Sequence, residues 1–129
     1  TDVERGIWAA AKSGDVDAIG RKLAEGANIN GLDQESGATA LTLAAIHDQT
    51  KVAEFLLEKG ADINVENLQG MTPLMLAASE GRLDVIHLLL EHKAETDVSD
   101  FTGRTAMMWA KRTGKKGAVR VLRGAGVKE

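Results

Sequence analysis

The 129-residue sequence predicts an all-α repeat protein, an α-solenoid of four stacked helix–turn–helix units joined by short β-hairpin-like fingers. The first observation behind this prediction is a period, because Gly37, Gly70 and Gly103 are each 33 residues apart and open similar runs of residues. The second is composition: hydrophobic residues make up 43% of the chain but aromatic residues only 3%. Thin helix pairs filled by Leu, Val, Ile and Ala suit this composition better than one large core.

The clearest unit lies between residues 70 and 90. Thr72 has the side chain of a helix N-cap, and Pro73 stands at the first helical position, where its missing N–H costs nothing. Gly81 can supply the left-handed backbone that ends many helices. A second apolar helix follows from Asp84, so the unit is predicted to be a helix, a tight turn and a helix.

The same unit recurs before and after this stretch. We expect one domain over residues 1–129, with repeats at about 1–33, 34–66, 67–99 and 100–129. Helices are predicted at 7–14 and 15–23, then at 40–47 and 51–58, in addition to the pair described above. One extra residue lies between Gly31 and Ser36, in an extended loop that tolerates insertions at little cost.

Both predicted end repeats carry charge where the middle repeats are apolar. Arg21 and Lys22 stand where the second repeat has Phe55 and Leu56. In the fourth repeat, Lys111 stands where the middle repeats have Ala45 and Ala78. Arg123 stands where they have Leu57 and Leu90. Terminal repeats of a stack need polar outer faces. These substitutions indicate a complete four-repeat unit with a cap at each end.

The 33-residue period and the pattern T-P-L-x-x-A at residues 72–77 resemble the ankyrin-repeat family over nearly the whole chain. The opening I-W-A-A-A-K-S-G-D is similar to small bacterial members of that family. The histidine that usually follows T-P-L is missing from every copy, where the chain has Trp8, Thr42, Met75 and Met108. We therefore expect other contacts between repeats to replace its hydrogen bonds. Lys93 replaces a helix-ending glycine, which predicts a strained left-handed backbone there.

Catalytic and metal-binding patterns are missing from the sequence. The chain has no cysteine, and its histidines are His47, His87 and His92, the last two being five residues apart and so poorly placed on one helix face. There is no G-x-S-x-G motif, phosphate-binding glycine loop or dinucleotide fingerprint. We expect no enzymatic activity, no metal and no cofactor.

The resemblance implies a protein-binding groove formed by the fingers and by the first helix of each repeat. Large apolar residues that the scaffold does not need to bury are Ile46, Leu68, Met71 and Phe101. An alternative is that Leu68 or Phe101 simply packs on the adjacent finger. The complete set of candidate binding residues is Glu35, Ser36, Ala38, Ile46, His47, Leu68, Gln69, Met71, Ser79, Glu80, Phe101, Arg104 and Arg112.

Tryptophans are common in binding hot spots, yet both tryptophans here favour structural roles. Trp109 aligns with Leu43 and Leu76 on the first helix of its repeat, which predicts partial packing in the core. Trp8 is expected to cover the exposed end of the stack.

Charge is unevenly distributed along the chain, whose net charge is −3. Residues 1–103 hold 8 basic and 18 acidic residues, whereas residues 104–129 hold 8 basic residues and only Glu129. The basic end could bind an anionic ligand or a nucleic acid, which is the alternative function, but a solvated cap would have the same charges. We expect a partner that is another protein rather than nucleic acid, no membrane insertion and a monomer.

A third possibility implied by the resemblance is that the chain is the substrate of a modifying enzyme. Asn30 and Asn64 stand at the asparagine that is hydroxylated in some eukaryotic ankyrin repeats. Added oxygen in a mass spectrum would identify the modified residue. We expect a soluble protein, with the cytoplasm favoured over export or the periplasm.

Overall fold

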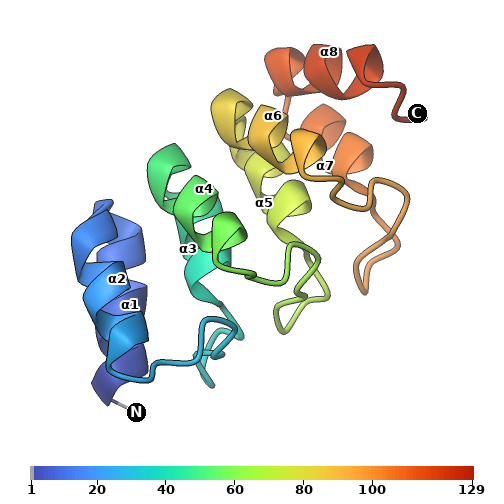
Figure 1. The fold of residues 1–129 in the computed structure, drawn as a ribbon. Helices are drawn as coiled ribbons and strands as arrows, with labels where there is room; N and C mark the ends of the chain where they lie inside the picture. Colours follow the sequence, from blue (N-terminus) through green and yellow to red (C-terminus); the bar gives the residue numbers. More distant parts are fainter. Residues whose placement is uncertain (1) are drawn as a thin grey trace.

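The computed structural model describes residues 2–129, so Thr1, where the first predicted repeat begins, lies outside the described residues. Eight helices form in the described residues and stack in four pairs (Figure 1). The first helices of the pairs are α1 (Asp2–Ser13), α3 (Ala40–Ile46), α5 (Pro73–Glu80) and α7 (Ala106–Arg112). The second helices are α2 (Val16–Ala24), α4 (Thr50–Glu58), α6 (Leu83–Glu91) and α8 (Lys116–Gly124).

The predicted all-α solenoid is confirmed, because each helix pair packs on the next and residues 2–129 contain no β-strand. The predicted helices form with small changes at their ends. The largest change is in α1, which begins at Asp2 rather than at Ile7. Val3 continues the apolar spacing of Ile7 by one turn, and Asp2 and Glu4 favour a helix N-terminus electrostatically.

Threonines begin three of the four first helices. The side chains of Thr39, Thr72 and Thr105 accept hydrogen bonds from the backbone N–H groups three residues later. Pro73 follows Thr72 as the first residue of α5. The predicted N-cap at Thr72 is therefore confirmed, and each such cap contributes about 1 kcal/mol to stability.

Left-handed residues end several helices. Gly81 ends α5 with φ 69°, and Lys93 after α6 has φ 65°, as the sequence predicts for both. Asp48, after α3, also has a left-handed φ of 58° and stands at the position that glycine occupies in the third repeat as Gly81. Sequence analysis missed Asp48, although aspartate tolerates this conformation better than most residues.

The core consists of two clusters of buried side chains that interlock in the middle of the stack. One cluster is formed mainly by α1 to α4 and the other mainly by α5 to α8. Ala45 of α3 nevertheless packs in the second cluster, and Leu88 of α6 packs in the first. The apolar interior therefore continues from one half of the stack to the other.

Two kinds of side-chain hydrogen bond link neighbouring repeats, which lack the usual histidine. The side-chain oxygens of Asn30 and Asn64 accept hydrogen bonds from the backbone N–H groups of Asp62 (2.8 Å) and Glu95 (2.9 Å) in the following repeat. Because both asparagines occupy the same place in their repeats, these bonds form a ladder along the stack.

The second kind of bond joins the start of a second helix to the end of the preceding repeat's first helix. Gln49 Nε2 donates to the carbonyl of Lys12 (2.8 Å), and Arg82 Nε donates to the carbonyl of Ile46 (3.0 Å). The last carbonyls of a helix have no partner inside that helix. These two side chains therefore satisfy such carbonyls and fix the position of each repeat on the next.

Candidate functional site: the finger and first-helix surface

Three loops project from the stack beside the first helices, and we call their tips the first finger (residues 33–38), second finger (67–71) and third finger (100–104). A backbone hydrogen bond closes each one like a hairpin. The donors are the N–H groups of Asp33, Asn67 and Asp100, and the acceptors are the carbonyls of Ala38, Met71 and Arg104, at 2.9, 3.0 and 2.9 Å respectively. The finger tips are therefore held in a defined shape.

Asp100 organises the third finger from a buried position, since only 5% of its surface is exposed. Its Oδ1 accepts hydrogen bonds from the Thr102 hydroxyl (2.6 Å) and from the backbone N–H groups of Thr102 (2.9 Å) and Arg104 (3.0 Å). Burial alone would raise the pKa of the carboxyl, but these bonds and one from Trp109 outweigh it and lower the pKa to about 2. Asp100 is therefore ionised at neutral pH.

Trp109 connects the third finger to α7. Its indole Nε1 donates to Asp100 Oδ2 at 2.8 Å, and the Arg104 guanidinium lies 5.3 Å from the centre of the indole ring. The ring also packs against the core cluster of α5 to α8. The structural role expected for Trp109 is present, and it positions Arg104 on the surface beside the finger.

Leu68 and Phe101 stand at the same place in the second and third fingers. Each lies against the glycine of the preceding finger, because a Cβ atom on Gly37 would be 3.0 Å from Leu68 Cγ, and one on Gly70 would be 2.6 Å from Phe101 Cδ1. The N–H of Phe101 also donates to the carbonyl of Gln69 (3.0 Å). The alternative that these residues pack on the adjacent finger is therefore correct in part.

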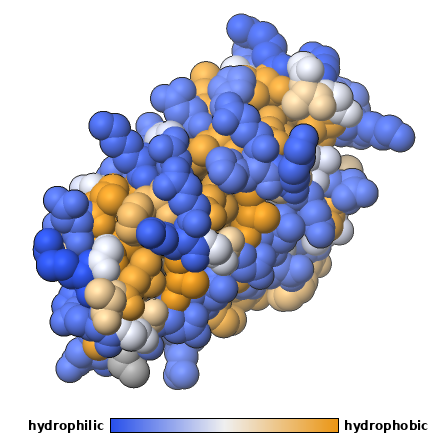
Figure 2. All heavy atoms as spheres, in the orientation of Figure 1, coloured by the Kyte–Doolittle hydropathy of each residue, from blue (hydrophilic) through white to orange (hydrophobic). Residues whose placement is uncertain are grey.

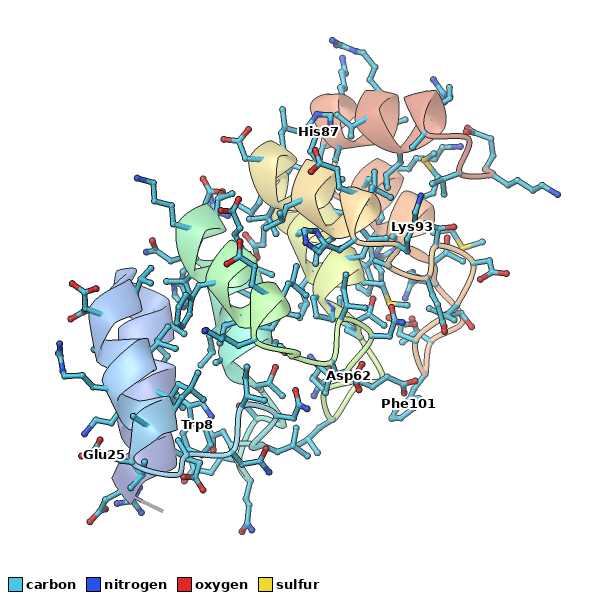
Figure 3. All side chains as sticks on the ribbon, in the orientation of Figure 1. Trp8, Glu25, Asp62, His87, Lys93 and Phe101 are labelled. Atoms are coloured by element: carbon cyan, nitrogen blue, oxygen red, sulfur yellow. The ribbon has the colours of Figure 1, made fainter. Side chains whose placement is uncertain are left out.

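The same two side chains nevertheless remain largely accessible to solvent. Leu68 is 55% exposed and Phe101 is 75% exposed. Figure 3 shows Phe101 at the tip of the loop between α6 and α7, away from the helices. Packing on a glycine thus holds one side of each residue and leaves the other side free for contact.

The first helices supply a floor next to the fingers. Leu43, Leu76 and Trp109 occupy the same position in α3, α5 and α7; Leu43 is buried, whereas Leu76 and Trp109 are partly exposed. Residues three and four positions later lie on the same face of each helix. This face therefore carries Ile46, His47, Ser79, Glu80 and Arg112, all of them exposed or partly exposed.

Most of the predicted binding residues form two groups separated by the length of a first helix. Glu35, Ser36, Leu68, Gln69 and Phe101 lie on exposed parts of the fingers, and Met71 and Arg104 are partly exposed at their bases. The five residues at the helix ends form the second group. The partly exposed floor joins the groups, and we call the whole area the finger surface.

Ala38 is a correction to the predicted set. It is only 5% exposed and packs in the core cluster of α1 to α4, so its side chain cannot contact a partner. Ala38 stands at the same position as Met71 and Arg104, directly before the N-cap residue of its first helix, but its small side chain is covered by the core cluster.

Leu32 is a residue that sequence analysis missed. It is 50% exposed and, together with Trp8 and Arg5, lines a hollow of about 560 Å³ beside the first finger. The indole of Trp8 donates to the carbonyl of Gly31 at 3.2 Å and is partly buried, in agreement with its expected structural role. The signal for Leu32 was its large apolar side chain in an otherwise polar linker.

The histidines lie apart in the structure. His47 follows α3, His87 lies on α6, and His92 follows α6 with its Nδ1 3.0 Å from the carbonyl of Leu88. Among residues 2–129 no three His, Asp or Glu side chains are grouped closely enough to hold a metal ion. Over the same residues, every helix is too short or too polar to cross a lipid bilayer.

Comparison with known families gives a match along almost the entire chain. A family model of three ankyrin repeats matches residues 4–67 and again residues 63–128. The chain belongs to the ankyrin-repeat family. Ankyrin repeats are generally modules for protein–protein interaction and are generally non-catalytic.

Two curated ankyrin-containing relatives match shorter parts of the chain. The ankyrin repeat protein YahD of Escherichia coli (strain K12) is 41% identical over 58 residues, which are 45% of this chain and 28% of YahD. The palmitoyltransferase akr1 of Schizosaccharomyces pombe (strain 972 / ATCC 24843) is 41% identical over 59 residues, which are 45% of this chain and 9% of akr1. The match thus spans less than a third of either relative.

Proposed function

We propose that this ankyrin-repeat chain is a non-catalytic binding module that holds a partner protein on its finger surface. The observation that carries the proposal is the pair of large apolar side chains on consecutive fingers, Leu68 and Phe101, which are both more than half exposed; Leu32, beside the first finger, is half exposed as well. Exposed apolar groups surrounded by polar residues often mark interaction sites. Figure 2 shows that, on the face it displays, apolar areas are interrupted by polar side chains.

The fingers are rigid enough to bind without a large loss of conformational freedom. Hydrogen bonds close each finger, and Leu68 and Phe101 are each supported by a glycine on the preceding finger. A surface that already has its bound shape loses little ordering entropy on association. The support of these two side chains therefore favours them as anchors for a partner.

Charges around the finger surface would select and orient the partner. Glu35 and Glu80 lie near its second and third repeats, whereas Arg104 and Arg112 lie at its fourth. A partner with cationic groups toward the N-terminal half and anionic groups toward α7 would match this arrangement. Such complementarity mainly sets orientation and association rate.

The test is affinity capture from a lysate of the source organism with the Leu68→Asp, Phe101→Asp double variant. Two charges at the apolar anchors should abolish capture of the partner, because truncating or charging a central anchor typically costs 2 kcal/mol or more, roughly thirtyfold in affinity. The captured proteins are identified by mass spectrometry. Circular dichroism establishes that the variant remains helical.

Leu83→Asp is the matched control. Leu83 is an exposed leucine at the start of α6, outside the finger surface, where an aspartate suits the helix N-terminus. This variant should retain the partner. A partner captured equally by the wild type, the control and the double variant would refute the finger surface as the binding site.

A further inference from the structure

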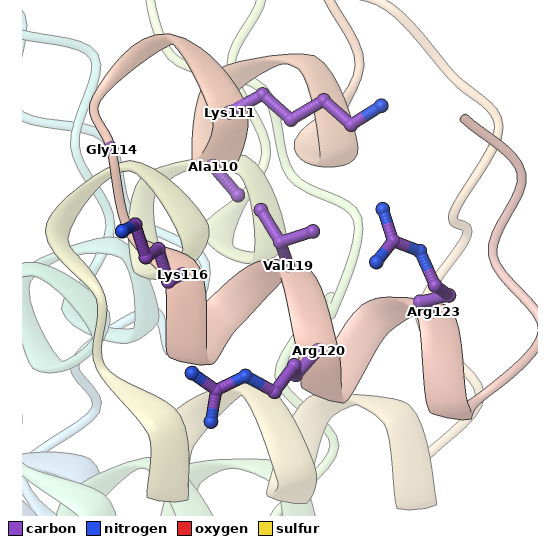
Figure 4. Close-up of a pocket in the computed structure, with 7 residues that line it drawn as sticks. All are labelled: Ala110, Lys111, Gly114, Lys116, Val119, Arg120 and Arg123. Atoms are coloured by element: carbon purple, nitrogen blue, oxygen red, sulfur yellow. The ribbon is translucent and has the colours of Figure 1, made fainter.

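The C-terminal end of the stack carries a concentrated positive charge. Residues 104–129 contain eight Lys or Arg residues and a single carboxylate side chain, Glu129. A hollow of about 440 Å³ opens at this end between α7 and α8 (Figure 4). Lys111, Lys116, Arg120 and Arg123 surround it, and Ala110 and Val119 form its apolar floor. We call these four cations and their floor the basic hollow.

The need to cap the stack does not explain the sign of this charge. A terminal repeat needs polar groups on its outer face, and glutamates would serve as well as lysines or arginines. A mixture of both signs would also avoid the mutual repulsion of eight cations. A face of one sign, on a chain whose other 103 residues are strongly acidic, instead indicates a site for an anionic partner.

A carboxylate already occupies one side of the basic hollow. Glu129 Oε1 lies 2.9 Å from Arg123 Nη2, and Glu129 Oε2 lies 3.2 Å from Arg123 Nε, so the arginine binds it with two parallel bonds. Lys111 Nζ forms a second ion pair with the same carboxylate. Glu129 thus shows how an external carboxylate could be bound in the same place.

On the other side of the basic hollow, two cations form no ion pair within the described part of the chain. Lys116 and Arg120 are exposed, and neither forms an ion pair with any carboxylate of residues 2–129. Their cations face water across a floor of two apolar residues. A ligand that fills the hollow therefore needs several negative charges together with an apolar group.

This chemistry fits an acidic peptide better than a nucleic acid. Proteins that bind single strands combine cations with aromatic rings on which the bases stack. At this end of the stack Trp109 is partly buried, and the guanidinium of Arg104 lies over its ring, so it offers no free face. The apolar floor suits an aliphatic side chain flanked by carboxylates.

We propose that the basic hollow is a second binding site, which takes an acidic peptide segment of a partner protein, and that Glu129 competes for it from within the chain. The segment would place carboxylates on Lys116 and Arg120 and would displace Glu129 from Arg123. An aliphatic side chain would lie on Val119. This site is separate from the finger surface and does not depend on it.

The test is fluorescence anisotropy with a labelled peptide of several glutamates around one leucine. The Lys116→Glu, Arg120→Glu variant should weaken binding about tenfold or more, because a lost charge pair and a new repulsion act together. The control variant Arg21→Glu, Lys51→Glu changes the net charge equally at exposed positions far from the hollow and should bind within about twofold of the wild type. Equal weakening in both variants would show general charge attraction and overturn the proposal.

Two further probes make the test specific for an acidic peptide. A peptide with glutamines in place of the glutamates should not bind, and an oligothymidylate of equal charge should bind more weakly than the glutamate peptide. Tighter binding of the oligothymidylate would overturn the proposal in favour of nucleic acid. The Leu68→Asp, Phe101→Asp variant should bind the glutamate peptide normally, so failure at one surface is distinguishable from failure at the other.

Glu129→Gln tests the competition. Removing the resident carboxylate frees Lys111 and Arg123 and should tighten binding of the glutamate peptide several-fold, with the largest gain at low salt. Unchanged or weaker binding by this variant would show that the peptide does not use the Glu129 position. That result would refute the proposed mode of binding.

Discussion

Asp100 holds the third finger through one carboxylate whose two oxygens have different partners. Oδ1 accepts three hydrogen bonds from within the finger, and Oδ2 accepts one from Trp109 on α7. At the equivalent place in the second finger, Asn67 Oδ1 accepts only the N–H groups of Gln69 and Met71. The third finger, which carries the most exposed apolar residue, is therefore also the most firmly held.

The hydrogen bonds to the ionised Asp100 carboxylate predict that stability depends on pH. Because the folded-state pKa of Asp100 is about 2 and its ordinary value is 3.8, its ionised form stabilises the fold above about pH 4, and this contribution disappears as the pH falls toward 2. Asp100→Asn should lower the free energy of unfolding by roughly 2 kcal/mol at pH 6. Urea denaturation at pH 6 and at pH 2.5 measures the effect.

The wild type and Asp100→Asn should become more alike in stability at low pH. The comparison between the two proteins separates Asp100 from the other carboxylates, which titrate in both. A gap in unfolding free energy that stays constant from pH 6 to pH 2.5 would contradict the role assigned to the ionised carboxylate.

At the scale of the helices, the ends differ in how well their residues suit the backbone. The two non-glycine residues with positive φ in residues 2–129 are Asp48 after α3 and Lys93 after α6. Aspartate visits this conformation readily, whereas lysine has no local hydrogen bond to offset the close contact of its Cβ with the backbone. Lys93 is therefore the more strained of the two.

Lys93→Gly should stabilise the protein. Relief of left-handed strain contributes about 1–2 kcal/mol, and the extra flexibility of glycine in the unfolded chain removes part of it, which leaves a gain of roughly 1 kcal/mol in unfolding free energy. Lys59→Gly is the matched control, because Lys59 also ends a second helix but has φ −89°. It should lose stability, and a gain from both variants would show that strain is not the cause.

Sequence analysis could locate the helices because their capping residues and apolar spacing are local features of each repeat. Thr72, Pro73 and Gly81 are local signals, and the structure confirms them. It could not find the exposure of Leu32, because a one-residue insertion leaves the register of that linker undecided. The burial of Ala38 was missed because Ala38 aligns with the partly exposed Met71 and Arg104 and is covered by contacts that spacing does not reveal. The hydrogen bonds of Asn30 and Gln49 to neighbouring repeats could not be predicted from the sequence either, because they depend on how the repeats are placed in space.

The surroundings of the candidate binding residues were predicted less completely than the helices. Leu68 and Phe101 stand out in the sequence as large apolar residues at finger positions. Their support on Gly37 and Gly70 requires contacts between repeats, which spacing along the chain does not reveal. Leu76, which aligns with Leu43 and Trp109, was not among the candidate residues, yet it is partly exposed on the floor of the finger surface.

For the whole molecule, the interlocked core predicts cooperative unfolding. Repeat stacks are stabilised mainly by contacts between neighbours, so weak contact between two halves would let them unfold separately. Here Ala45 and Leu88 each pack into the cluster of the other half. We therefore expect residues 1–129 to unfold as one domain in a single transition.

The two tryptophans, at opposite ends of the stack, can test this expectation. In Trp8→Phe only Trp109 reports, and in Trp109→Phe only Trp8 reports. Each variant is expected to be less stable, because each indole donates a hydrogen bond. Within each variant, however, the urea midpoints from fluorescence and from circular dichroism should coincide. Midpoints that differ within one variant would show that the ends unfold independently.

The finger surface has a consequence for the conformation of whatever binds it. Leu68 and Phe101 belong to repeats whose first helices α5 and α7 pack together, and packed helices lie about 8–10 Å apart. A polyproline II segment aligns every third side chain at about 9 Å, and an α-helix aligns every seventh at about 10 Å. A β-strand aligns its side chains at about 7 or 13 Å and misses this interval. The partner's sequence should therefore show apolar residues with a period of three or seven.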